Sequence, residues 1–416
     1  MDLRSILSAA LRRGASGHRI FSRRFARSVA ERVAVRLGLS SPAEKFRYLL
    51  QLTEVELARG VAAPDCAALR LEWIVPPFDA GSGGHSTIFR LTAELARRGH
   101  RNRFWFTPGN RFASPKETHA AMQRWFTPQT CEVEFILPES IDRIVGDVCI
   151  ATEHTTAYYA AAVRNVQARC YLVQDFEPFF FPHGSAYLVA EQTYRLALEP
   201  ITCSRWLSSM LQPYYGYVAP RFELAIDPSC YRRLQGVNRS ARPSVAFYLR
   251  DVTPRRCAEL GVLALELLAE RLPDLEVHFF GQPRLEFERK AFRAVHHGVV
   301  SPAKLAQLYN EVRVGVVFSA TNHSLIPAEM MACGLPVLEL DSPSITMDFP
   351  AGSLVRALPH PRAMADAMAR LLSDQDAWER QQQHGLAFAA GLKWTTSAAQ
   401  LNDIIVEKVR SKLVPH

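Results

Sequence analysis

The strongest constraint on the fold is a pattern of short apolar runs that alternates with helical stretches and occurs twice along the chain. In the first half these runs lie at 71–75, 103–106, 133–137, 148–151 and 170–173. In the second half they lie at 245–249, 277–280, 312–318 and 336–340. This alternation is typical of a parallel sheet with crossover helices. The sequence therefore predicts an α/β fold with two Rossmann-like domains facing across a cleft, because ligands of such sheets bind at the carboxyl ends of the strands.

Four segments follow from the pattern. Residues 1–65 are expected to form a basic helical extension, and residues 66–238 the first domain. Residues 239–393 are expected to form the second domain, and residues 394–416 a C-terminal helix that returns to the first. Gly236–Pro243, "GVNRSARP", has the composition of a linker between the two domains. Ser41-Pro-Ala-Glu44 resembles a capping box and predicts a helix running to about residue 59.

The positive charge of the chain is concentrated at its N-terminus. Residues 1–40 contain nine Arg, one Asp and one Glu, which gives +7 of the formal net charge of +8. Apolar residues recur there every four positions, from Phe21 to Leu37, with arginines between them. This arm is either a helix on an anionic membrane surface or a helix packed on its own protein with a solvated basic face. The nearly neutral remainder argues against a nucleic-acid partner.

Composition also bears on location. No apolar run reaches the roughly 18 residues that a membrane-spanning helix needs. The eight cysteines are scattered without a C-x-x-C pair, so free thiols in a reducing compartment are expected. Arginines interrupt any signal-peptide core, whereas an organellar transit peptide would share the arm's composition. We expect a cytoplasmic protein, with peripheral contact at the inner face of the membrane as an option.

A glycine-rich loop follows the first apolar run. "DAGSGGHSTIF", Asp79–Phe89, leads from a predicted strand into a predicted helix, where backbone N–H groups commonly bind phosphate. The loop lacks the third spaced glycine of the dinucleotide fingerprint, and the next strand ends without a carboxylate for a ribose. These absences disfavour a nicotinamide enzyme. A loop that merely needs a tight turn remains the structural alternative.

The second domain carries the more specific motif. In "SLIPAEMMACGLPVLEL", Ser324–Leu340, the carboxylate of Glu329 lies at a helix start after a strand. This stretch resembles the GT-B glycosyltransferases of family four, with their E-x7-E motif and Gly-x-Pro-Val turn. "YLVQDFEPFFFPHGSAYLVAEQTY", Tyr171–Tyr194, and "SATNHSLIPAEMMACGLPV", Ser319–Val337, are similar to bacterial WsaF-type rhamnosyltransferases. The resemblance covers roughly residues 69–395 and implies the GT-B fold.

The resemblance also implies a function. It predicts transfer of a sugar, L-rhamnose from dTDP-L-rhamnose, to a polysaccharide or lipid-linked glycan, without metal or cofactor and with retention at the anomeric carbon. Glu329 would bind the donor ribose, while Arg250 and Arg255 (or Arg256) would bind the diphosphate. The remaining donor contacts are assigned to Gly83, Gly84, His297, Asn322 and Ser324.

Three strand ends in the first domain supply further candidates. Asp175 and His154 are assigned to catalysis beside the two arginines, and His85, Asp175 and Glu177 to the acceptor. Each has a structural alternative: Asp175 and Glu177 as turn residues before Pro178, His154 as a satisfied structural group, and His85 as a support of the glycine loop. Asp374-Gln-Asp376 matches a D-x-D metal signature but lies between helical stretches, so a helix cap is expected there.

One departure from the family pattern matters. Thr321, or Asn322 if one residue is missing, stands where the first glutamate of E-x7-E is expected, and no acid lies between Arg313 and Glu329. The loss fits a 6-deoxy sugar, which has one hydroxyl fewer to bind. It equally fits a non-catalytic GT-B scaffold in a glycan-assembly complex. Retention of the cations that would bind phosphate favours the enzyme.

Overall fold

The computed structural model describes residues 43–58, 63–109, 111–250, 253–284 and 291–413. The chain forms two compact units, residues 1–51 and 52–416. The basic arm, residues 1–40, lies outside the described residues. In the first unit the structure describes one short 3-10 helix, η1, Glu44–Leu50.

The helix predicted from Glu44 to about residue 59 therefore ends early. From Leu52 to Ala58 the backbone is extended or irregular. It pairs instead with the end of a helix in the second unit: Val55 N–H donates to the Ala161 carbonyl at 3.2 Å, and Ala58 N–H to that of Arg164 at 2.9 Å. Ala161 lies in the last turn of that helix, His154–Ala162, where carbonyls have no partner within the helix, and Arg164 follows the helix; both carbonyls can therefore accept from the segment's N–H groups.

The first domain contains a six-stranded parallel sheet in the order β3-β2-β1-β4-β5-β6. Its strands are β1 Arg70–Val75, β2 Arg101–Phe106, β3 Glu132–Phe135, β4 Val148–Ala151, β5 Ala168–Val173 and β6 Glu199–Thr202. Its helices are α3 Gly83–Arg97, α4 Pro115–Trp125, α5 His154–Ala162, α6 Ser185–Gln192 and α7 Arg205–Tyr215, with the 3-10 turns η2 Pro138–Arg143, η3 Glu177–Phe180 and η4 Thr193–Arg195. Strands β4 and β5 are buried along their whole length, as expected for strands covered on both faces.

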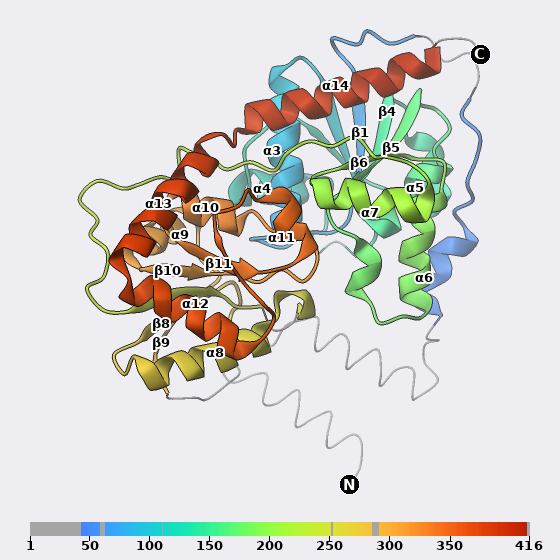
Figure 1. Cartoon of the computed structure of the whole chain (residues 1–416). Helices are drawn as coiled ribbons and strands as arrows, with labels where there is room; N and C mark the ends of the chain where they lie inside the picture. The colour runs from blue at the N-terminus through green and yellow to red at the C-terminus, as the bar shows by residue number, and fades with distance from the viewer. Residues whose placement is uncertain (1–42, 59–62, 110, 251–252, 285–290, 414–416) are drawn as a thin grey trace. The chain divides into compact units, whose positions relative to one another are not determined.

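The second domain repeats this arrangement in the order β12-β11-β10-β7-β8-β9. Its strands are β7 Ser244–Tyr248, β8 Glu276–Phe280, β9 Arg293–Gly298, β10 Val314–Val316, β11 Val337–Leu340 and β12 Val355–Ala357. Its helices are α8 Ala258–Arg271, α9 Pro302–Glu311, α10 Ile326–Ala332, α11 Pro343–Asp348, α12 Pro361–Ser373 and α13 Gln375–Ala390, with the 3-10 turn η5 Pro254–Arg256. Helices α8 and α12 lie side by side on one face of this sheet, and α9 and α10 pack on the other (Figure 1).

Local sequence explains several element ends. Ser301 caps α9 by accepting from Lys304 N–H at 3.5 Å, and Pro302 occupies the first helical position. Gly334, with φ +65°, ends α10 in a conformation that favours glycine. Asp374 accepts from Ala377 N–H at 2.9 Å, so it caps α13. The capping role predicted for the Asp374-Gln-Asp376 motif is confirmed for Asp374, while Asp376 lies in the first turn of α13.

Two connections join the domains. In the first, Arg239 donates to carbonyls at the ends of α9 and α10, including those of Val312 at 2.7 Å and Cys333 at 2.8 Å. These are carbonyls that a helix end leaves unpaired, so the guanidinium fixes the linker onto the second domain. In the second, α14, Trp394–Leu413, packs on α3 and the first sheet, where Lys408 and Lys412 pair with Glu199 (Figure 1).

Candidate active site

The carboxyl ends of strands in the two sheets meet at Asp175, which follows β5. Its Oδ1 accepts from the backbone N–H of Asn322 at 3.0 Å, and its Oδ2 accepts from the hydroxyl of Thr321 at 2.8 Å. Both partners follow β10 of the second domain. Burial raises the pKa of Asp175, while Arg255 and these hydrogen bonds oppose the rise. Asp175, which was assigned to catalysis and the acceptor with a turn residue as its structural alternative, is thus a buried bridge between the domains.

Arg255 lies at the same meeting point. Its Nε is 3.5 Å from Oδ2 of Asp175, and its guanidinium carbon lies 4.0 Å from the centre of the Phe180 ring. Arg256 points elsewhere: it is buried and donates to Ser319 Oγ at 2.7 Å. Of the two arginines offered by the motif, Arg255 is therefore the one available to a ligand, whereas Arg256 supports the loop after β10.

Arg250 follows β7 and contributes a second cation. Its positive charge lowers the pKa of Arg255, an effect secondary to burial, so the two guanidinium groups lie near each other. In the described part of the chain the Nε atoms of both arginines are buried without a hydrogen-bond acceptor. Buried donors are normally paired, so these two are suited to an anion.

The glycine loop begins α3 and approaches the second domain. Gly81 has φ +77°, and a Cβ added there would lie 3.2 Å from Val299, which follows β9. Gly83 has open space where a side chain would project, and Gly84 lies against Gln174. The exposed glycines thus leave the N-terminus of α3 accessible to a ligand.

His85 supports this loop. Its Nδ1 is 2.7 Å from Ser82 Oγ, and its Nε2 is 3.0 Å from the Pro76 carbonyl, so Nε2 carries the proton and Nδ1 accepts. Burial lowers the pKa of His85 to about 4, which keeps the ring neutral. Both ring nitrogens are engaged within the loop. This geometry fits the structural alternative rather than the predicted contact with an acceptor.

Glu329 lies in the first turn of α10 and faces groups of the first domain. Burial raises its pKa to about 7, opposed by the charge of Arg90 on α3 and a hydrogen bond with Tyr231. Arg90 is shared, because its Nη1 also lies 3.1 Å from Asp227 Oδ2. A carboxyl that titrates near neutrality beside a cation is a frequent feature of ligand sites.

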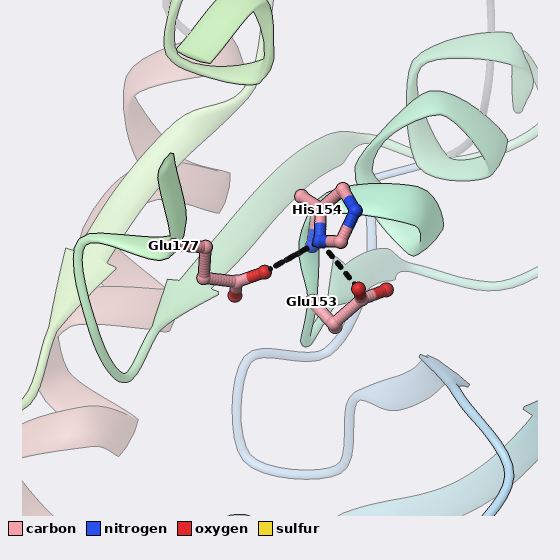
Figure 2. A group of neighbouring side chains, drawn as sticks. All are labelled: Glu153, His154 and Glu177. Carbon is pink, nitrogen blue, oxygen red and sulfur yellow. Dashed lines mark hydrogen bonds and ion pairs between the residues drawn. The ribbon is translucent and has the colours of Figure 1, made fainter. Parts of the chain in front are cut away.

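His154 and Glu177 form a second cluster with a residue that the sequence did not indicate, Glu153. The imidazole Nδ1 lies 2.9 Å from Glu177 Oε2 and contacts Glu153 as well, and Figure 2 shows the ring between the two carboxylates. Burial disfavours the charged ring, but the two carboxylates raise the pKa of His154 to about 10. Glu177 also accepts from His154 N–H at 2.7 Å and from the Tyr171 hydroxyl at 3.1 Å.

This triplet is the one set among the described residues with the ligand types and proximity for a metal ion, its candidate atoms lying within 4.8 Å of one another. A protonated imidazole has no lone pair to offer a metal, and here the proton is held between two carboxylates. The arrangement therefore works as an ion triplet, in which the imidazolium offsets one of the two carboxylate charges, and it fixes the loops after β4 and β5. The side chain of Glu153 could have been suspected from its place at the cap of α5.

Of the remaining residues predicted to bind the donor, Asn322 and Ser324 lie on the loop after β10, whereas His297 lies on β9. Asn322 binds the first domain through its amide, Nδ2 lying 2.9 Å from the Gln174 carbonyl. Ser324 has a buried hydroxyl with no partner in the described part of the chain. His297 instead pairs with His278 on the second sheet, at 2.9 Å between ring nitrogens, and both rings have lowered pKa values because of burial. The structure gives no described contact between His297 and the Asp175–Arg255 cluster.

Between the domains lies a cavity of about 480 Å³ that is lined in part by the 323–325 loop. It is lined by the turn between β6 and α7, by 221–225, by α11 and by 388–392. Across it Asp348 of α11 accepts from Arg205 N–H at 2.7 Å and Trp206 N–H at 3.3 Å, and so caps α7 of the opposite domain. Two carboxylates, Asp175 and Asp348, therefore cross the interface in opposite directions.

Comparison with known proteins places this architecture. Residues 243–369 match the family model "WsaF, C-terminal domain". The O-antigen biosynthesis protein RfbC of Myxococcus xanthus is 31% identical over 311 residues, which are 70% of this chain and 24% of that protein. The chain thus spans about a quarter of the length of that relative.

Solved structures with the same fold are more distant in sequence. Anabaena HepE in complex with UDP-glucose has a TM-score of 0.62 at 14% identity, covering 82% of this chain and 100% of that one. WaaG, a glycosyltransferase involved in lipopolysaccharide biosynthesis, has a TM-score of 0.58 at 13% identity, covering 80% and 99%. The predicted two-domain α/β fold is confirmed as GT-B. Within that fold, residues 243–369 are similar to the C-terminal domain of WsaF, so the likeness to WsaF is shown for the second domain.

Proposed function

We propose that the chain transfers a sugar from a nucleoside-diphosphate donor to a glycan or lipid-linked acceptor in polysaccharide assembly. The observation that carries this proposal is the pair of half-buried arginines, Arg250 and Arg255, whose buried Nε atoms make no hydrogen bond in the described structure, although that of Arg255 lies 3.5 Å from Asp175 Oδ2. They follow β7, beside the loop after β10. An anion with several oxygens, such as a diphosphate, fits this set of donors.

The chemistry assigned to the site is electrostatic. Breaking the bond between sugar and phosphate builds negative charge on the leaving diphosphate. Cations and N–H groups already fixed at that point stabilise this charge more in the transition state than in the ground state. Arg250, Arg255 and the N-terminus of α3 supply them, and Glu329 accepts from the donor ribose. We infer that no metal takes part and that the sugar is transferred with retention.

For the donor we propose dTDP-L-rhamnose. The match of the second domain to the WsaF model supports it, as does Thr321, which offers a hydroxyl where a larger acid would bind a further sugar hydroxyl. Because HepE and its complexes contain UDP or UDP-glucose, a uridine donor is the natural competitor. A thermal-shift panel of dTDP, UDP, GDP and NAD decides between them: a ligand at 100 times its Kd stabilises the protein by about 2.7 kcal/mol.

Thr321 also supports a second candidate, a non-catalytic GT-B scaffold in a glycan-assembly complex. Its hydroxyl is occupied by Asp175 of the opposite domain, an arrangement that could serve simply to hold two domains together. A scaffold should bind none of the panel, or bind without turnover. Release of dTDP from dTDP-rhamnose in the presence of acceptor membranes would exclude it.

A further inference from the structure

The carboxylate of Asp175 occupies a site whose donors are otherwise supplied by the second domain. These donors are the Asn322 N–H at 3.0 Å, the Thr321 hydroxyl at 2.8 Å and the Arg255 guanidinium, whose Nε lies 3.5 Å away. The exception is the N–H of Phe176, the next residue, which donates to Oδ1 at 2.9 Å. Asp175 as a whole residue is 8% exposed, so the contact is shielded from water.

Such a set of groups is built for a small anion. A backbone N–H, a hydroxyl and a guanidinium are the donors that recur around phosphate oxygens. They lie on the loops after β7 and β10, where the proposed function places the donor diphosphate. Without Asp175, the second domain would retain the Asn322, Thr321 and Arg255 donors with no anion between them.

We propose that Asp175 is a built-in substitute for an anionic oxygen of the donor diphosphate, which closes the empty site and is displaced when the nucleotide binds. The inference rests on the proposed function, since it requires the diphosphate to use these donors. It makes the bridge between Asp175 and the second domain an autoinhibitory contact. The pair of Arg255 with Phe180 belongs to the same closed arrangement, because both partners of the arginine come from the β5–α6 connection.

The cost to the ligand can be bounded. When a fraction of the protein holds the competing contact, the apparent Kd rises by the reciprocal of the free fraction. A contact formed in 90–99% of molecules would weaken binding by about 10- to 100-fold. A contact of two hydrogen bonds to a carboxylate and one ion pair is of sufficient strength for such a population.

The test compares Asp175→Asn with wild type and with Asp348→Ala. Asn at 175 keeps the shape but loses the charge, and its NH₂ group opposes the Thr321 and Arg255 donors. Asp348→Ala removes the other carboxylate, which crosses the interface at the cap of α7 and bonds Arg205 and Trp206 instead of Arg255. The probes are dTDP, inorganic pyrophosphate and thymidine, each titrated by calorimetry.

The expected result is about 10-fold or more tighter binding of dTDP and pyrophosphate to Asp175→Asn, with thymidine affinity unchanged and Asp348→Ala like wild type. Equal or weaker dTDP binding by Asp175→Asn, when wild type binds dTDP, would overturn the inference and leave the proposed function standing. A gain of the same size in Asp348→Ala would also overturn it, because general loosening of the interface would then explain the effect. Failure of every protein to bind any nucleotide would reject the proposed function itself.

Hydrogen exchange on the wild-type protein gives a second test that does not depend on folding of a variant. Addition of dTDP should increase exchange in the peptide that contains Asp175 and Phe176, because their contact is released. The peptide 319–325 should remain protected, because phosphate oxygens replace the carboxylate. Increased protection of both peptides would show that Asp175 stays in place and would contradict the displacement.

Discussion

Replacement of Glu329 by Gln should separate stability from ligand binding. Burial raises the pKa of Glu329 from 4.5 to about 7, against the opposing effects of Arg90 and Tyr231. A carboxyl whose pKa is higher in the folded state binds its proton more tightly there. Its ionisation therefore lowers stability as the pH rises from about 4.5 to about 7, and the full loss persists above.

The size of the effect follows from the shift. At 1.36 kcal/mol per pKa unit, a rise to about 7 corresponds to about 3 kcal/mol at alkaline pH. About 1.4 kcal/mol of this is already present near pH 5.5, because the carboxyl has ionised in the unfolded chain. Glu329→Gln removes the titration, so the stability of the variant relative to wild type should increase by about 2 kcal/mol between about pH 5.5 and about pH 8.5.

The assay is thermal or urea unfolding of both proteins without ligand at the two pH values. Glu379→Gln is the matched control, because this exposed carboxyl on α13 lies in the same domain. At about pH 8.5 the Glu329→Gln variant should also bind nucleotide about 10-fold more weakly, since a hydrogen bond to a charged group is worth about 1.5–3 kcal/mol and one to a neutral group about 1. A constant stability difference across pH would refute the assigned titration, and unchanged binding by the folded variant would refute the ribose contact.

Three further predictions concern other parts of the chain. Arg250→Ala or Arg255→Ala should each cut turnover, measured as dTDP release, by about 100- to 1,000-fold, and the Arg→Lys variants should recover part of it. Wild-type activity that is lost with EDTA and restored by manganese would reject the metal-independent mechanism. His154→Gln should destabilise the protein most at about pH 6.5 and below, and its melting-temperature deficit should shrink toward about pH 10, because a raised histidine pKa gives stability that is lost as pH climbs from about 6.5 to about 10. Removal of residues 1–40 should abolish salt-sensitive binding to anionic vesicles, at about 1 kcal/mol per basic residue, and leave nucleotide affinity intact; a truncated protein that still binds vesicles would assign the arm a structural role.

The sequence predicted those strands that are covered on both faces. Runs such as Val148–Ala151 and Ala168–Val173 are apolar throughout because helices cover them on either side. It missed β6, β9 and β12, which are three of the four outer strands of the two sheets; the fourth, β3, was predicted at 133–137. The β9 sequence "RAVHHG" is largely exposed, so no hydrophobic pattern marks it. An edge strand is defined by its pairing with an inner strand, and the residues of the edge strand alone do not reveal that pairing.

The candidate site shows the same division. Local motifs located Arg250, Arg255 and Glu329, because each belongs to a strand end followed by a helix. The contact of Asp175 with Asn322 joins residues 147 positions apart, and neither neighbourhood carries a sign of the other. His297 was assigned to the donor from the resemblance of its segment to the family, whereas its side chain pairs with His278 across two strands. Side-chain direction at a strand end depends on register and packing, which the sequence leaves open.

The bridge at Asp175 also bears on the choice between enzyme and scaffold. The acid missing at position 321 is matched in space by an acid of the opposite domain, because the Thr321 hydroxyl donates to Asp175 Oδ2. A scaffold would need this contact permanently, so its loss should lower the unfolding temperature without changing any ligand affinity. An enzyme needs it to open, so its loss should cost some stability and increase diphosphate affinity at once. Stability and affinity measured on the one Asp175→Asn protein therefore distinguish a structural bond from one that the donor must break.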